Sequence, residues 1–568
     1  MSSTERLIET VRESIIGASE VLNGPYGQRR VTYADYTASG RCLSFIEQYL
    51  IDEVMPTYAN THTEASSTGR TTTHLREQAR EIIHEAVGGG DDDVVLFCGS
   101  GATGAIDKLI RCLNISLPYE LDKRYDLASK VPEEERPVVF IGPYEHHSNE
   151  LPWRESIAEV VTIPENEDGL ICQKTLEERL AEYIDRPLKI GSFSAASNVT
   201  GIGSKTDEIA ILLHKYGALS FWDFAAAGPY VQIEMNLRAA GPDGHLAYKD
   251  ALFLSPHKFI GGPGTPGILV AKRHVFGNTV PAVPGGGTVS YVNPTHHTYL
   301  EDIEHREEGG TPDIIGSIRA GLVFQLKEAI GHEVIYQREH GFIDRAIRAW
   351  EPNPNIQILG NPDLWRLSIV SFVVRHGPDR YLHHNFVVAL LNDLFGIQSR
   401  GGCSCAGPYG HRLLGIDIDR SQAFKREIIK GCEGIKPGWV RVNFNYFLAD
   451  EEADFIIRAV DWVATHGHKL LSQYTFAPLT GLWTHRDGVQ RRENSLRDIS
   501  YRRGRMEYPS RHATEPAWMV ERYLEMANET IAQLEQRGQA DAVIDPERSA
   551  DFESLRWFSL PSDGLRSA

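Results

Sequence analysis

Lys258 stands just beyond a short apolar stretch, in a run of residues that suits covalent chemistry. Residues 251–254 are apolar, and Ser255-Pro256-His257-Lys258 and a glycine-rich turn follow them. Burial beside cations or apolar walls lowers the pKa of a lysine amine, which frees it to condense with an aldehyde. The run therefore predicts either the Schiff-base lysine of a pyridoxal phosphate site or a surface lysine at the end of a strand.

A second run of small residues could bind the phosphate of such a cofactor. Cys98-Gly99-Ser100-Gly101-Ala102-Thr103-Gly104 follows an apolar stretch and opens a helical pattern. Small residues let backbone N–H groups surround an anion, and a helix N-terminus adds partial positive charge. Ser255 and His257 are further donors. The alternative is a plain turn between a strand and a helix.

Asp223 and a pair of histidines also follow apolar stretches. A carboxylate at Asp223 could keep a pyridine nitrogen protonated, although aspartate is also a common helix N-cap. His146 and His147 come just after residues 138–141, where an imidazole could stack on an aromatic cofactor. Two histidines could equally bind a metal ion, but no acidic or cysteine partner at suitable spacing completes a ligand set. We therefore expect no metal.

The composition limits the classes of function. The 568 residues include 58 basic and 77 acidic side chains, a net charge of -19 that argues against nucleic acid as a partner. The seven cysteines form neither a dense disulfide framework nor a paired zinc pattern, so we expect the reducing cytoplasm. No apolar run approaches the roughly 20 residues needed to cross a bilayer, and the first residues predict an amphipathic helix rather than a signal peptide. We expect no membrane association.

Short apolar runs alternate with helical patterns along most of the chain. The predicted strands are residues 94–97, 138–141, 160–163, 190–194, 219–222 and 251–254, and helices are expected at 173–183 and 205–216. This alternation predicts an α/β fold with a mostly parallel sheet covered on both faces. Ligands then bind at the carboxyl ends of the strands, where the residues above lie.

Four segments are expected along the chain. They are an N-terminal helical segment (1–30), a large cofactor-binding domain (31–313), a small α/β domain (314–470) and a C-terminal extension of unknown role (471–568). The small domain should contain a helix from Ile314, strands at 365–374 and 440–447, and a helix at 381–395. Residues 118–136 read as a surface insertion, and residues 517–536 as an amphipathic helix.

Several motifs in one order resemble a known family. Residues 97–103, 145–153, 197–201, 223, 255–258, 308–312 and 400–408 resemble the class V aminotransferases of fold type I, and are most similar to group II cysteine desulfurases and selenocysteine lyases. The resemblance covers residues 30–465. It implies a large domain with a mostly parallel seven-stranded sheet, a smaller α/β domain and pyridoxal 5'-phosphate as cofactor.

The resemblance also implies a role for each matching residue. Lys258 would be the Schiff-base lysine, Asp223 the pyridine partner, His146 the stacking histidine and Asn198 a contact near the ring hydroxyl. Further residues would hold the phosphate: Ala102, Thr103, Ser255, His257 and, from the neighbouring subunit of a homodimer, Thr311. Arg441 would clamp the substrate carboxylate, for which a planar guanidinium is suited, and Arg400 would be a second, substrate-binding arginine of the active site. Without the resemblance, either arginine could be part of a surface ion pair.

Cys405 occupies the place of the group II nucleophile, which follows Arg-x-Gly after two intervening residues. The implied reaction converts L-cysteine to L-alanine and leaves a persulfide on Cys405, from which a sulfur-acceptor protein could be served. Arg400 and His146 are candidates to favour the thiolate. Two buried structural cysteines are the alternative, and Cys403 has no counterpart in the usual motif.

One departure from the family keeps other functions open. Relatives usually have glutamine or histidine three residues after the pyridine aspartate, whereas this chain has Ala226. Another class V reaction, such as an aminotransferase, epimerase or β-lyase acting on a different amino acid, is therefore an alternative. A sulfur-relay or scaffold protein that uses Cys403 and Cys405 is a third, because fold alone does not fix function.

Overall fold

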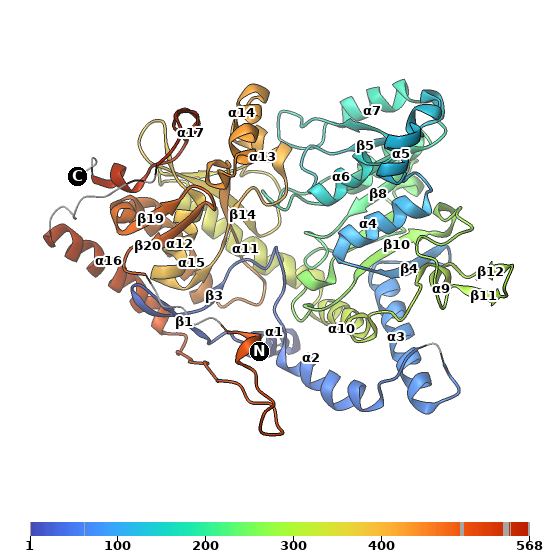
Figure 1. Ribbon diagram of the computed structural model, residues 1–568, viewed down its shortest axis with the longest axis horizontal. Coiled ribbons are helices and arrows are strands. Elements are labelled where there is room, and N and C mark those ends of the chain that lie inside the picture. Colours follow the sequence, from blue (N-terminus) through green and yellow to red (C-terminus); the bar gives the residue numbers. More distant parts are fainter. Residues whose placement is uncertain (1, 62, 489–493, 538–544, 546, 566–568) are drawn as a thin grey trace. The chain divides into compact units, whose positions relative to one another are not determined.

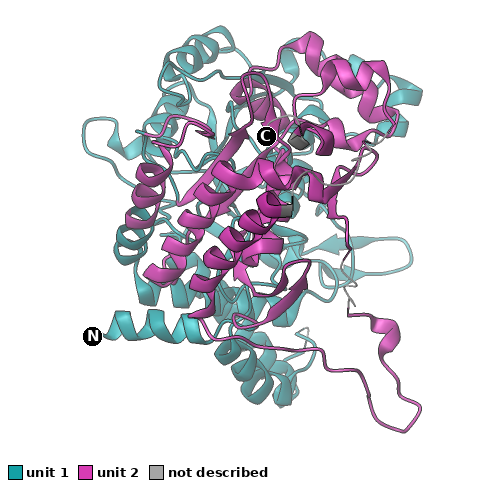
Figure 2. Ribbon diagram, turned by 90° about the vertical axis from the view of Figure 1, so that its left-hand side faces the viewer, with its two compact units in different colours: residues 1–16, 36–340, 363–367 teal, residues 17–35, 341–362, 368–568 magenta. Residues whose placement is uncertain are grey.

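The chain folds into two compact units, each built from separate stretches of sequence. The computed structural model describes residues 2–61, 63–488, 494–537, 545 and 547–565. Unit 1 comprises residues 1–16, 36–340 and 363–367, and unit 2 comprises residues 17–35, 341–362 and 368–568 (Figure 2). Residues 314–340 thus belong to unit 1 and residues 471–568 to unit 2. Residues 489–493, 538–544, 546 and 566–568 of the predicted extension lie outside the described residues, and the four-part division stays a prediction.

Unit 1 contains a seven-stranded sheet (Figure 1). Its strands, in spatial order, are β4 (Asp93–Cys98), β10 (Gly267–Lys272), β9 (Ala251–Leu254), β8 (Leu219–Asp223), β7 (Lys189–Ser194), β5 (Val138–Ile141) and β6 (Glu159–Thr162). The pairs from β9 to β6 are parallel, while β10 is antiparallel to both β4 and β9. The predicted fold class, an α/β fold with a mostly parallel sheet, is confirmed.

The six predicted strands are short runs rich in apolar residues. Five of them lie in strands that are almost fully buried, whereas β6, at the edge of the sheet, is partly exposed. Their helical connections are α4 (Gly101–Cys112), α6 (Leu151–Arg154), α7 (Gln173–Glu182) and α8 (Thr206–Lys215). Elsewhere in unit 1, α3 (Ser67–Ala86) packs against α10 (Ile314–Ile330), and the remaining elements are α1 (Ser3–Glu13), α2 (Ser44–Tyr49), α9 (Ile303–Glu307), β11 (Val289–Val292) and β12 (His297–Tyr299). The predicted surface insertion contains the exposed helix α5 (Tyr119–Tyr125).

Unit 2 contains a smaller antiparallel sheet. Its strands are β13 (Ile356–Ile358), β14 (Ile369–Arg375), β18 (Trp439–Asn443) and β17 (Arg400–Gly402), with β15 (Tyr381–Leu382) beside β14. Its helices are α12 (His384–Phe395), α13 (Gly407–Leu413), α14 (Ile418–Ile429), α15 (Asp450–His466), α16 (Met519–Arg537) and α17 (Ala550–Leu555), and α11 (His332–Trp350) has its carboxyl-terminal part here. Two further pairs are the hairpin of β1 (Val21–Gly24) and β2 (Gly27–Arg30), and the parallel pair of β3 (Thr32–Tyr33) and β16 (Ile397–Gln398).

Some predicted boundaries in this region were wrong. The strand expected from Trp365 begins at Ile369, and the helix expected from Tyr381 begins at His384 because β15 precedes it. Apolar patterns do not mark such ends, which depend on pairing with distant strands.

The segment expected as an extension supplies part of the core of unit 2. A hairpin of β19 (Tyr474–Ala477) and β20 (Leu482–His485) buries Tyr474, Phe476 and Trp483, and Phe558 is also buried in the same cluster. Trp557 stacks on His384 with ring centroids 5.7 Å apart. Among the described residues, no helix is both long and apolar enough to cross a membrane.

Candidate functional site

The carboxyl ends of the parallel strands in unit 1 bring Lys258 and Asp223 to one edge of the sheet. Asp223 ends β8 and is paired in register with Ser194 of β7 and Phe253 of β9. Lys258 follows β9 by four residues and is half-buried. Burial raises the pKa of Asp223, while the Ala225 N–H that it accepts at 2.8 Å and the charge of Lys258 act in the opposite direction. A cation near this carboxylate would favour its charged form.

The small residues at the start of α4 form a cradle around the side chains that follow β9. The Ala102 N–H donates to Ser255 Oγ at 2.8 Å. Gly101 has a φ of +55°, and a Cβ there would lie 2.9 Å from Ser255 Oγ and 3.3 Å from His257 Nε2. Only glycine therefore fits at this position. Burial, and then the charge of Lys258, lower the pKa of His257 to about 4, so its imidazole is neutral at pH 7.

Ser148 links the histidine loop after β5 to this cradle. Its hydroxyl lies 2.6 Å from Thr103 Oγ1 and 3.0 Å from His146 Nδ1, and its N–H donates to the same Nδ1 at 3.1 Å. Because Nδ1 accepts the N–H, the neutral imidazole of His146 carries its proton on Nε2. The structure thus links His146 to Thr103 through Ser148, and Ala102 to Ser255, with His257 close to Gly101.

Glu145 is a component of this edge that the sequence analysis missed. Its Oε1 accepts the N–H of Gly142 at 3.2 Å and of Ser194 at 2.9 Å, and its Oε2 accepts the Ser194 hydroxyl at 2.6 Å and the Asn149 amide at 2.7 Å. Burial raises its pKa to about 7. Glu145 thereby fixes the loop before His146 to the end of β7. An acidic residue four positions after the end of a fully apolar strand was the available signal.

Asn198 lies in a turn after β7. Ser197 Oγ accepts the N–H groups of Val199 at 3.1 Å and Thr200 at 3.2 Å, which holds the turn, and the side chain of Asn198 is buried within it. Thr311 is exposed, and its Oγ1 accepts the Asn60 amide at 3.3 Å.

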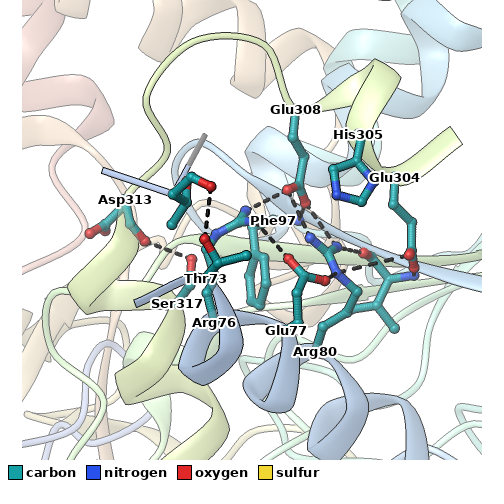
Figure 3. A network of polar contacts seen from close by, with 12 residues as sticks. Thr73, Arg76, Glu77, Arg80, Phe97, Glu304, His305, Glu308, Asp313 and Ser317 are labelled. Carbon is teal, nitrogen blue, oxygen red and sulfur yellow. Dashed lines mark hydrogen bonds and ion pairs between the residues drawn. The ribbon is translucent and has the colours of Figure 1, made fainter. Parts of the chain in front are cut away.

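A buried ionic network anchors the loop that carries Thr311 (Figure 3). Glu308 accepts the Phe97 N–H at 2.6 Å and pairs with both Arg76 and Arg80, whose guanidinium carbons lie 5.0 and 5.1 Å from the Phe97 ring centroid. The side chains of Arg76, Arg80 and Glu308 are each 6% exposed. Burial acts to raise the pKa of Glu308, but the charges of Arg80 and Arg76 outweigh it and hold that pKa below its usual value.

A cavity of about 680 Å³ opens beside the cradle within unit 1. Residues from the cradle, from the loop after α9 and from α4 line it, including Gly99, Ser100, Gly101, His257, Glu307 and Gly309. A space of this size is typical of sites for small ligands.

In unit 2, Arg400 and Arg441 meet at a shared carboxylate. They are directly opposite one another in the pairing of β17 with β18. Asp35 lies between them: its Oδ1 is 2.9 Å from Arg441 Nη2 and its Oδ2 is 3.0 Å from Arg400 Nε. The sequence analysis did not single out Asp35, because nothing local distinguishes it from other aspartates after a strand.

Cys403 and Cys405 follow β17. Cys405 is exposed and Cys403 is half-buried, so the alternative of two buried structural cysteines is wrong for Cys405. Ser404 and Cys405 have φ values of 50° and 56°, in the left-handed region that residues with a Cβ rarely adopt. All seven cysteines of the chain lie within the described residues, and each is free.

Known proteins share this fold and these sequence motifs. The family described as aminotransferase class-V matches residues 32–452. A "Probable cysteine desulfurase" of Halalkalibacterium halodurans is 26% identical over 382 residues, 66% of this chain and 84% of that protein. Another from Staphylococcus aureus is 25% identical over 392 residues, 68% of this chain and 86% of that protein. The apo structure of a cysteine desulfurase from Thermococcus onnurineus has a TM-score of 0.60 at 21% identity and covers 77% of this chain and 95% of that chain.

The seven-stranded, mostly parallel sheet and the likeness to this solved structure show the fold, an α/β fold of the fold-type I class. The match over residues 32–452 spans most of the chain, and the chain belongs to the aminotransferase class-V family. The predicted family resemblance is thereby confirmed: the chain is an enzyme of this family, and the two relatives named above are described as probable cysteine desulfurases.

Proposed function

We propose that this protein is a pyridoxal phosphate-dependent cysteine desulfurase, which converts L-cysteine to L-alanine and retains the sulfur as a persulfide on Cys405. The observation that carries this proposal is the exposed Cys405 thiol on a loop directly after the strand of Arg400, with a backbone in the left-handed region. Rare backbone conformations persist where surrounding structure holds them, often at functional sites. The names of the relatives support the same reaction.

The residues of unit 1 fit pyridoxal phosphate as the cofactor. The start of α4 offers backbone N–H groups to a phosphate, and the glycine at residue 101 leaves space that a Cβ would fill. Ser255 and the neutral His257 supply further hydrogen-bond donors. The buried carboxylate of Asp223 suits a protonated pyridine nitrogen, since burial otherwise disfavours its charge. Lys258, Asn198 and His146 would complete the set around the ring.

The chain's own residues account for the proton and sulfur transfers. When bound, the cofactor supplies an electron sink for charge at the substrate Cα. Arg441 and Arg400 orient the substrate carboxylate, and the Lys258 amine takes the Cα proton. The Cys405 thiolate attacks the substrate sulfur, so an S–S bond forms while the C–S bond breaks. The carbon keeps the electron pair and gains a proton, and the products are alanine and the Cys405 persulfide.

The proposal also covers the oligomeric state, the partner protein and the cellular compartment. Thr311 is exposed, and the family resemblance implies that this position contacts a neighbouring subunit's phosphate site, so we expect a homodimer. A persulfide must be passed on, and a sulfur-acceptor protein is the expected partner. Seven free cysteines fit the reducing cytoplasm.

One measurement of products tests the reaction. Purified protein is incubated with L-cysteine, and alanine, sulfide and keto acid are measured for the wild type, Cys405→Ala and the matched control Cys432→Ala, a half-buried free cysteine of the same unit. We expect alanine release to fall at least a hundredfold in Cys405→Ala only. Equal turnover by Cys405→Ala would reject the nucleophile, and keto acid without sulfide would favour an aminotransferase instead, as Ala226 allows.

The cofactor is tested separately. Purified wild type should absorb light in the range of lysine-bound pyridoxal phosphate, and Lys258→Ala should lose this absorbance while remaining folded by circular dichroism. Wild-type protein that takes up no pyridoxal phosphate on titration would reject the cofactor.

A further inference from the structure

We propose that Asp35 is an internal competitor for the substrate carboxylate: its carboxylate occupies Arg400 and Arg441 until a substrate displaces it. This inference rests on the proposed role of the two arginines as the carboxylate clamp. Each oxygen of Asp35 contacts a different guanidinium group, at 2.9 and 3.0 Å, as the two oxygens of a bound carboxylate would.

The backbone of unit 2 holds Asp35 at this point. The Ala34 N–H donates to the Gln398 carbonyl at 2.9 Å, and the Ala34 carbonyl accepts the Asn443 N–H at 3.1 Å. Gln398 is two residues before Arg400, and Asn443 is two residues after Arg441. Asp35, the residue after Ala34, therefore lies beside both arginines. Backbone hydrogen bonds fix its position, so its ion pairs with the arginines are not those of a freely moving surface side chain.

Repulsion between the two arginines favours a negatively charged side chain at position 35. Arg400 and Arg441 are directly opposite on antiparallel strands, a position in which like charges repel. Arg441 is 3% exposed and Asp35 13% exposed, so water screens their charges poorly. Asp35 reduces the charge of the cluster from two positive units to one. Arg400 is 46% exposed and can turn toward a second carboxylate.

This arrangement affects the affinity of the two arginines for a substrate carboxylate. An incoming carboxylate must break at least one charged hydrogen bond of Asp35 before it gains its own, which weakens its binding. A doubly negative group meets a cluster with only one net positive charge. The clamp is therefore set for the single carboxylate of an amino acid, and Asp35 determines its affinity.

The experiment compares Asp35→Asn with the wild type as cofactor-loaded full-length protein. Propionate binding is measured by calorimetry, and KM and kcat for L-cysteine are measured in parallel. The variant removes a charged acceptor from both guanidinium groups, and part of the gain is offset when Arg400 rehydrates, so we expect propionate to bind about tenfold more tightly. KM should fall by a similar factor, and kcat should not rise. Asp35→Glu, which keeps the charge, should resemble the wild type.

Asp563→Asn is a matched control, because Asp563 also bridges two arginines, Arg380 and Arg556, and is 16% exposed in the same unit. It should leave propionate binding unchanged. If Asp35→Asn does not fold, Asp35→Ser tests the same loss of charge. A neutral variant that is folded and binds propionate no more tightly than the wild type overturns the inference. Tighter propionate binding without any alanine release from cysteine would instead reject the proposed function and leave the inference standing.

Discussion

Replacing Glu308 with glutamine should strongly destabilise unit 1, because this side chain is the anion of a buried network (Figure 3). The carboxylate accepts hydrogen bonds from two guanidinium groups and one backbone N–H, and a glutamine keeps only one acceptor oxygen. Removing one partner of a buried ion pair costs about 3–5 kcal/mol. Arg80 keeps its contact with Glu77 at 2.9 Å, so we expect a loss near the lower end, about 3 kcal/mol.

The loss is measured by urea unfolding, followed by the fluorescence of the buried Trp153 and Trp222 of unit 1. Hydrogen exchange at residues 309–311 should also accelerate, because Glu308 anchors that loop. The exposed pair of Glu182 with Arg179 provides the control, and Glu182→Gln should change the free energy of unfolding by less than about 0.5 kcal/mol.

The pH dependence sharpens this test. The pKa of Glu308 is lowered by its arginines, so the stability it contributes is present above about pH 4.5 and is lost as the pH falls through the folded-state pKa. The wild type and Glu308→Gln should therefore begin to converge in stability below about pH 4.5, and should become equal only once the pH is below the folded-state pKa of Glu308. A loss smaller than about 1 kcal/mol at pH 7, or a difference that does not shrink in acid, would refute the reasoning.

Two further predictions follow from the cradle and from the core of unit 2. Gly101→Ala should weaken pyridoxal phosphate binding at least tenfold, because a Cβ would lie 2.9 Å from Ser255 Oγ. Gly341→Ala is the control and should leave cofactor binding unchanged, because a Cβ there meets open space. Equal cofactor affinity of Gly101→Ala and the wild type in spectroscopic titration would contradict the prediction. Burial lowers the pKa of His384 to about 3, so the unfolded chain binds more protons below about pH 6.5 and stability falls as the pH drops. Between pH 7 and pH 5, the free energy of unfolding measured in urea should fall by about 2 kcal/mol less for His384→Gln than for the wild type. If both proteins lose the same stability over this pH range, His384 is not a neutral buried imidazole.

Local sequence predicts the sheet of unit 1 well, because its strands are short and most of them are buried on both faces. Strands β5 and β9 have the predicted bounds, Val138–Ile141 and Ala251–Leu254. The antiparallel direction of β10 was beyond such reasoning, since an apolar run carries no sign of the direction in which it pairs.

Sequence reasoning likewise predicted some residues of the candidate site and missed others. Lys258, Asp223 and the cradle residues each follow an apolar run, and the parallel order of the strands is enough to place them at one edge. Asp35 was missed because its partner Arg441 is separated from it by several hundred residues, and the pairing depends on strands β3 and β18 meeting in space. Glu145 was passed over because a histidine beside it offered more obvious chemistry.

The discontinuous makeup of unit 2 has a consequence for the order in which the protein can fold during synthesis. Unit 1 has all its residues once Leu367 has been made, whereas residues 17–35 of unit 2 must wait for partners made much later. The Tyr523 hydroxyl accepts the Arg30 N–H at 2.8 Å, and Tyr474 and Trp483 complete the apolar cluster around α12. Domains that fold during synthesis generally do so from the amino-terminal side. Here the segment after β3 that carries Asp35, and the two arginines that Asp35 joins, are among the last parts to be completed, so an interrupted chain would contain the cradle of unit 1 without the completed cluster of Asp35, Arg400 and Arg441.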